Sequence, residues 1–148
     1  NPNYKLLIAG KGEQKEEIKK FIGNNKLDKN IILLGYIKNI FPLIKNSTAF
    51  ILPSLWEGMP NVVLEGMAAG LPVVSFRVQG ITELLGHHPS PQVAAPGDYT
   101  TFCQNVAMIA GSPEMAQELG HTNAIDVTRF SIPAMVDRYT QLYLALTE

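Results

Sequence analysis

The stretch Ala49 to Phe76, AFILPSLWEGMPNVVLEGMAAGLPVVSF, decides the fold that the sequence predicts. It opens with a short apolar run, residues 49–52, and closes with another, residues 72–76. Between them lie a loop and a helical pattern that starts near Pro60. Two short apolar strands joined by a helix form a βαβ unit, whose strands are parallel and covered on both faces.

The same alternation runs along the rest of the chain. Further strands are expected at residues 4–9, 31–34 and 92–95, and helices at about 13–25 and 39–46. Three helices follow, with start signals at Asp98, Ser112-Pro113 and Ser131. Side chains expected to point inward are Ile18, Phe21, Ile22, Phe102, Val106 and Ile109, and the last helix carries Met135, Val136, Tyr139, Leu142, Tyr143 and Leu146 at helical spacing. Right-handed crossovers then predict an α/β fold, a doubly wound parallel sheet of about five strands with C-terminal helices.

Ligands of such folds bind beyond the carboxyl ends of the strands. One of these ends, Gly10-Lys11-Gly12, begins like a dinucleotide fingerprint, but Lys15 stands where the third glycine belongs and no acid follows the second strand. The stretch is not a P-loop either, because no Gly-Lys-Ser/Thr follows. A tight strand-to-helix turn explains the two glycines without any ligand.

Two carboxylates, Glu57 and Glu65, occur in one of the most apolar parts of the chain. The helix that carries Glu65 is otherwise apolar, so we expect it to be buried nearly all round, where an unpaired carboxylate is costly. Between Lys45 and Arg129 the only basic residue available for a salt bridge is Arg77. Two alternatives remain open at this point: a polar ligand with hydroxyl donors, or structural hydrogen bonds to backbone N–H groups.

The start of this helix has no side chain suited to capping it. Pro60 suits the first turn, but Gly58 and Met59 before it offer no Ser, Thr or Asp oxygen. An uncapped helix N-terminus beside a strand end favours an anion.

Composition sets the class of protein. In the 148 residues, 46% hydrophobic and 17% charged side chains are typical of a globular domain, and no apolar run is long enough to span a bilayer. A lone Cys103 fits a reducing compartment and hence a cytoplasmic location. No Cys/His group has metal-site spacing, and His87-His88 beside Pro89 is interpreted as a surface loop.

Charge is unevenly distributed along the chain. All lysines precede residue 46 and all arginines follow residue 76. A basic first half is one signal of nucleic-acid binding, but acids interleave with these lysines in a helical pattern and aromatic residues do not, so no nucleic acid is expected. The switch from lysine to arginine motivates a second hypothesis, in which the two halves have different parents.

The run from Ser54 to Val74 resembles the E-x(7)-E signature of the retaining GT-B glycosyltransferases of group 1, which use nucleotide-sugar donors. The resemblance rests on Glu57-Gly58 and on Glu65-Gly66-Met67-Ala68-Ala69-Gly70, followed by Pro72-Val73-Val74. Other stretches that resemble the family are Leu7 to Gly12, Ile32 to Tyr36, Phe50 to Ser54, Gly80 to Glu83 and Ala95 to Asp98. The resemblance covers residues 1–148 as a single domain, the C-terminal, donor-binding half of such an enzyme.

The resemblance implies a role for each matching position. Glu57, the expected catalytic residue, would contact hydroxyls of the transferred sugar, and Glu65 would contact the ribose of the nucleotide. The remaining expected donor-binding residues are Gly58, Met59, Asn61 and Val62 through their backbone N–H groups, Gly10 and Gly12 in the first glycine-rich turn, and Tyr36 and Ile37 beside the base. No metal and no cofactor are expected, and the partner is a nucleotide sugar, in a pathway of polysaccharide biosynthesis.

The chain also departs from the family pattern. In the family, one strand leads to an Arg and a Lys that bind the diphosphate, and an N-terminal domain binds the acceptor. Both are expected upstream of Asn1. We therefore expect a piece truncated at its N-terminal side, which alone transfers no sugar. An alternative is a non-catalytic or engineered Rossmann- or flavodoxin-like domain that keeps the motif as inheritance.

The missing strand also bears on the sheet. The full domain would have the order 3-2-1-4-5-6 with that strand at the centre. Without it, either the gap closes to the flavodoxin-like order 2-1-3-4-5, which we favour, or open edges lead to a dimer.

Overall fold

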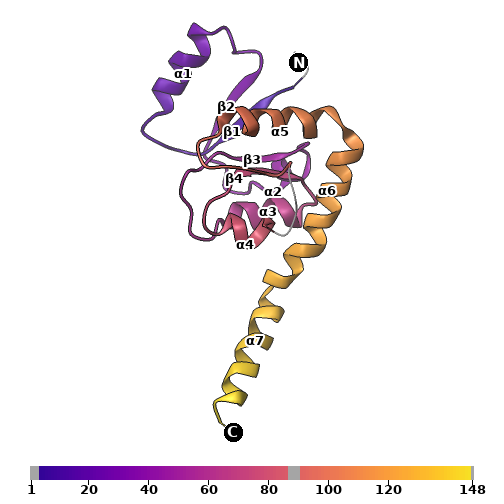
Figure 1. Ribbon diagram of the computed structural model, residues 1–148. Helices are drawn as coiled ribbons and strands as arrows, with labels where there is room; N and C mark the ends of the chain where they lie inside the picture. Colours follow the sequence, from indigo (N-terminus) through magenta and orange to yellow (C-terminus); the bar gives the residue numbers. More distant parts are fainter. Residues whose placement is uncertain (1–3, 87–90, 148) are drawn as a thin grey trace. The chain divides into compact units, whose positions relative to one another are not determined.

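The computed structural model describes residues 4–86 and 91–147, and the chain divides into two compact units, residues 1–40 and 41–148 (Figure 1). The loop predicted at His87-His88 lies outside the described residues. Each unit alternates strands and helices, and the strands of each are parallel. The fold class is therefore the expected α/β class, with helices at the C-terminus.

The first unit holds two strands and one helix. Strand β1 (Leu6–Ala9) pairs with β2 (Ile31–Gly35) from Leu6↔Ile31 to Ala9↔Gly35, and α1 (Lys15–Asn24) connects them. Of the described residues in this unit, only Ile22 is buried. The prediction that Phe21 points into a core is wrong, since its side chain is 58% exposed, and Ile18 lies at the same surface. A sheet of two strands is too narrow to cover the whole apolar face of the helix.

The second unit holds the remaining elements. They are α2 (Phe41–Lys45), β3 (Phe50–Leu52), α3 (Asn61–Ala68), β4 (Val73–Phe76), α4 (Ile81–Leu85), β5 (Val93–Ala94), α5 (Tyr99–Gly111), α6 (Pro113–Asp126), the 3-10 turn η1 (Val127–Phe130) and α7 (Ile132–Ala145). The sequence patterns predicted all of these except α4 and η1, which are each a single turn or little more.

Strand pairing gives two sheets, with the orders β1-β2 and β3-β4-β5, rather than one continuous sheet in the order 2-1-3-4-5. The expected neighbours are correct within each sheet. Among the described residues, β1 pairs only with β2 and β3 only with β4, so no strand ladder joins the two sheets.

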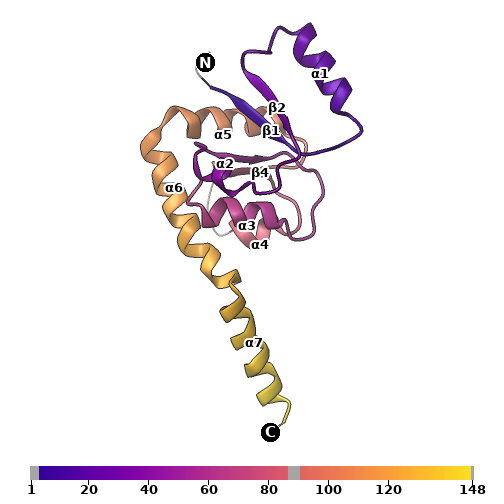
Figure 2. The same ribbon diagram turned by 180° about the vertical axis from the view of Figure 1, so that it is seen from behind.

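The core of the second unit surrounds β4. All four of its residues are buried, because β3 and β5 flank it and helices cover both faces of the sheet. In Figures 1 and 2, α3 and α4 lie on one face and α5 on the other. The side chain of Phe76 packs on Phe102, with ring centroids 4.7 Å apart, and edge-on against Tyr99 at 5.3 Å.

A buried polar cluster joins α6 to the start of β4. The Asn123 amide donates to the carbonyl of Leu71 at 2.8 Å and exchanges hydrogen bonds with the Gln92 side chain, whose oxygen also accepts from Val73 N–H. Both amide side chains are completely buried. Because every partner is satisfied, the cluster fixes the position of α6 at the amino end of β4.

The three predicted helix caps are confirmed. Asp98, Ser112 and Ser131 each accept a hydrogen bond from the backbone N–H three residues on. Helix α7, by contrast, runs away from the sheet of its unit (Figure 2). None of its residues is buried, so its apolar stripe lies at the surface.

Candidate functional site

Glu57 and Glu65 lie on the two sides of the junction between β3 and α3. Glu57 occupies the loop after β3 and is half-buried, whereas Glu65 lies in the second turn of α3 and is exposed. The expectation that α3 is buried nearly all round is wrong. The helix buries one stripe, Val63, Gly66 and Met67, and its opposite face is open, so Glu65 pays no large desolvation cost.

Neither carboxylate has a partner among the residues that the structure describes. Across residues 4–86 and 91–147, no hydrogen bond or ion pair involves the side chain of Glu57 or Glu65, and Arg77 forms no ion pair with them. The alternative of structural hydrogen bonds is therefore not supported by the geometry. Both groups remain available to accept hydrogen bonds from a ligand.

The N-terminus of α3 is uncapped, as the sequence predicted. Pro60 is the N-cap residue and not the first residue of the helix, so the helix begins one residue later than expected. No side chain caps it. The carbonyl of Pro60 accepts from Val63 and Leu64, which leaves the N–H groups of Asn61 and Val62 without an acceptor among the described residues. Free N–H groups at the positive end of a helix favour an anion.

A residue that the expected site did not include, although Gly80 to Glu83 is one of the stretches that resemble the family, packs directly against this loop. Gly80 has φ +80°, and a Cβ atom built on it would be only 1.9 Å from the carbonyl oxygen of Gly58. The N–H of Gly80 donates to the side chain of Glu83, three residues on, at 2.7 Å.

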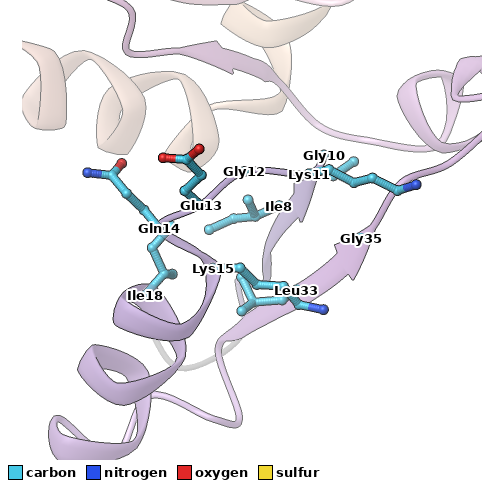
Figure 3. Close-up of a pocket in the computed structure, with 11 residues that line it drawn as sticks. Ile8, Gly10, Lys11, Gly12, Glu13, Gln14, Lys15, Ile18, Leu33 and Gly35 are labelled. Carbon is cyan, nitrogen blue, oxygen red and sulfur yellow. The ribbon is translucent and has the colours of Figure 1, made fainter.

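Two of the four expected residues of the first unit line a cavity of about 260 Å³ at the carboxyl ends of β1 and β2. Gly10 and Gly12 line it together with the start of α1, and Figure 3 shows the side chains of Lys11 and Lys15 at its rim. Tyr36 follows β2 and is exposed; the Lys11 ammonium lies 4.9 Å from the centroid of its ring. Ile37 is half-buried. These four predicted residues thus gather at one end of the first unit's sheet.

Within the described ranges, no group of three or more His, Cys, Asp or Glu side chains is arranged to hold a metal ion. In the same residues, no helix is long and apolar enough to cross a membrane.

A model of one protein family, described as glycosyl transferases group 1, matches residues 1–112. This chain belongs to the group 1 glycosyltransferases. The chain is 46% identical over 74 residues to an uncharacterised glycosyltransferase of Methanocaldococcus jannaschii. This match covers 50% of this chain and 18% of that protein. It is 28% identical over 144 residues to the UDP-Gal:alpha-D-GlcNAc-diphosphoundecaprenol alpha-1,3-galactosyltransferase of Escherichia coli, covering 97% of this chain and 37% of that one.

Solved structures show the same fold for this group 1 chain. Anabaena HepE in complex with UDP superimposes with a TM-score of 0.84 at 18% identity, covering 98% of this chain and 42% of HepE. The galactosyltransferase WaaB in its apo form gives a TM-score of 0.78 at 19% identity, covering 97% of this chain and 42% of WaaB. The chain thus spans less than half the length of each of these relatives.

Proposed function

We propose that this chain is the donor-binding half of an enzyme that transfers a sugar from a UDP- or GDP-sugar to an acceptor with retention. The observation that carries the proposal is the junction of β3 and α3. There, the Glu57 and Glu65 carboxylates lie on either side of a helix start whose first N–H groups, like both carboxylates, have no partner among the described residues. Carboxylates suit the hydroxyl groups of a sugar and a ribose, and the helix start suits the diphosphate between them.

The proposed roles are those that the resemblance to the family implies. Glu57, in the loop, accepts hydrogen bonds from the transferred sugar and is the catalytic residue. Glu65, one turn into α3, accepts from the ribose. The N–H groups of Gly58, Met59, Asn61 and Val62 face the sugar and diphosphate; Gly10, Gly12, Tyr36 and Ile37 lie beside the nucleoside. Support for a uridine nucleotide comes from relatives: HepE was solved with UDP, and the E. coli relative is named for a UDP-galactose donor.

Catalysis requires more than these residues supply. No lysine or arginine belongs to the β3–α3 junction, residues 53–70, so this segment itself offers the diphosphate no charge-assisted bond. We propose that a further domain provides the acceptor site and that the chain alone transfers no sugar. The exposed, unpaired Cys103 supports a cytoplasmic setting.

The test is an NMR titration of the 148-residue chain with UDP and with UDP- and GDP-sugars. Glu65→Gln should weaken the binding of UDP and of the UDP-sugar alike, because both ligands contain the ribose. Glu57→Gln should weaken the binding of the UDP-sugar but not that of UDP, since only the transferred sugar reaches that carboxylate. Each loss should be about tenfold in affinity, the effect of one hydrogen bond to a charged group.

Glu118→Gln is the matched control, because it removes an exposed carboxylate on α6 with the same change of charge. Turnover by the chain alone would contradict the proposed need for a second domain. If no nucleotide or nucleotide sugar binds, and Glu65→Leu raises stability, the chain is instead a non-catalytic domain that retains the motif.

A further inference from the structure

In the described part of the chain, no hydrogen bond holds the loop that carries Glu57. Among the described residues, residues 55–59 form no hydrogen bond to backbone or side chain. Gly58 and Met59 are exposed. Nothing in the loop itself therefore fixes the directions of its N–H groups or of the Glu57 side chain.

The loop is instead supported from beneath by the turn at Gly80. A Cβ atom at this position would lie 1.9 Å from the Gly58 oxygen, 2.8 Å from its carbonyl carbon and 3.0 Å from Pro60 Cδ. Contact this close means that backbone packs directly on backbone, and any larger residue would displace the loop. The φ of +80° at Gly80 also excludes most other side chains.

Gly80 is held in turn by the short helix α4. Its N–H donates to Glu83 Oε2 at 2.7 Å, and its carbonyl accepts from Leu84 N–H at 3.2 Å. The apolar side chains of α4, Ile81, Leu84 and Leu85, are completely buried. Glu83 thereby ties the turn to an element anchored in the core.

The other end of α4 is fixed by Arg129 from η1. Its Nη2 donates to the carbonyl oxygens of Glu83 at 2.7 Å and Leu84 at 3.2 Å. The guanidinium also lies 4.9 Å from the ring centroid of Phe130. A cation on the last carbonyls of a helix satisfies groups that have no partner within it.

We propose that Gly80, Glu83 and Arg129 are positioning residues for the donor site. Arg129 holds α4, α4 and Glu83 hold Gly80, and Gly80 supports the loop from Glu57 to Val62. The inference rests on the proposed function, because it gives this chain of contacts the task of aligning donor-binding groups. Such groups must be held to within about 0.5 Å by the residues behind them.

The experiment separates alignment from stability on the full 148-residue chain. Glu83→Ala and Arg129→Ala remove the contacts, while Glu83→Gln and Arg129→Lys keep an acceptor oxygen and a donor nitrogen. Gly80→Ala is the most severe variant, and the other two sites keep the test valid if it fails to fold. Asn123→Ala is the control, since it weakens the same unit at the amino end of β4.

Two measurements are made on every variant. The first is the backbone ¹⁵N order parameter of Gly58, Met59, Asn61 and Val62, which needs no ligand. We expect it to fall from about 0.85, typical of a rigid backbone, towards 0.6 in both alanine variants. The second is the dissociation constant for UDP, which should rise about tenfold in these variants, as for one misaligned hydrogen bond.

The inference is supported if the conservative variants bring the dissociation constant for UDP back to within about threefold of that of the unmodified chain. It also requires that Asn123→Ala lowers stability but changes neither the order parameters nor the affinity for UDP. It is overturned if the alanine variants leave both measurements unchanged, or change them no more than Asn123→Ala does. If the unmodified chain binds no UDP, the proposed function fails, and the order parameters still decide whether these residues position the loop.

Discussion

Strands β1 and β4 are both four residues long and mostly apolar, yet their surroundings differ completely. All residues of β4 are buried, whereas in β1 Leu6 is 42% and Leu7 37% exposed. The difference comes from neighbours, because β4 lies between two strands and β1 has one partner. A sheet of two strands is marginal in water, while three strands covered by helices form a stable core. Strand-forming sequence alone therefore does not make a stable unit.

The residues proposed to bind the donor come from both units. Glu57, Glu65 and the free N–H groups of α3 belong to the unit with the extensive core. The glycine-rich turn and Tyr36 belong to the unit in which, of the described residues, only Ile22 is buried. We therefore expect Glu57 and Glu65 to keep their local geometry more firmly than the glycine-rich turn and Tyr36 do.

Removing the same side chain from the two units should give the largest contrast. Phe76→Ala deletes a fully buried ring that packs on Phe102 and Tyr99, and should lower the free energy of unfolding by about 3–5 kcal/mol. Phe21→Ala removes a ring that is 58% exposed and should cost about 0.5 kcal/mol or less. Urea unfolding followed by circular dichroism measures both. Equal losses would show that the first unit has a core as demanding as the second.

The buried amide cluster should give the next largest effect. Asn123→Ala leaves the Leu71 carbonyl and the Gln92 amide without their partner, and should cost about 2–4 kcal/mol. Thr122→Ala, its neighbour on α6, removes only a hydroxyl bonded to the Glu118 carbonyl and should change stability by about 0.5 kcal/mol at most. A loss below 1 kcal/mol at Asn123 would mean that water replaces the side chain.

Sequence patterns predicted the strands well, because each is a short apolar run bounded by turn residues. They failed where the outcome depended on partners distant in sequence. Phe21 has the spacing of a core residue but lacks a sheet wide enough to cover it. The helix α3 is apolar enough to be buried all round, yet only the stripe around Val63 and Met67 meets the sheet.

The candidate site was predicted in part for the same reason. Glu57, Glu65 and the uncapped start of α3 are local features, and a sequence motif records them. Gly80 and Arg129 act through contacts across tens of residues, such as the 46 that separate Arg129 from Glu83. Helix α4 has five residues, too few for a helical period to be recognised.

Replacing a helical glycine by alanine should change stability in opposite directions in the two units. Gly120 in α6 lies against the Gly70 turn, and a Cβ atom there would be 2.0 Å from the Gly70 oxygen, so Gly120→Ala should cost about 1–3 kcal/mol. Gly23 in α1 has nothing within 4 Å of that position, and Gly23→Ala should stabilise α1 by about 0.4–1 kcal/mol. Thermal unfolding by circular dichroism tests both. A destabilising Gly23→Ala would indicate that this side of α1 packs against something in solution.

Helix capping should give the smallest contrast, and it depends on pH. Helix α1 starts at Gln14 without a side-chain cap, whereas α5 is capped by Asp98. The hydroxyl of Thr101, 2.6 Å from Asp98, and then the backbone N–H of Thr101 lower the pKa of that carboxyl below its usual 3.8. Since the folded chain favours the ionised form, the stabilisation is complete above the unfolded pKa. It is lost as the pH falls through the lower folded pKa.

Asp98→Asn keeps a capping oxygen but cannot ionise, so it isolates this dependence. The difference in melting temperature between the unmodified chain and Asp98→Asn should be constant above about pH 5 and move against the unmodified chain below about pH 4. Asp137→Asn on α7 makes the same change of charge without removing a helix cap, and corrects for net charge. A difference that stays flat down to pH 2 would show that Asp98 caps α5 equally well when protonated. The contrast between α1 and α5 would then come from geometry and not from charge.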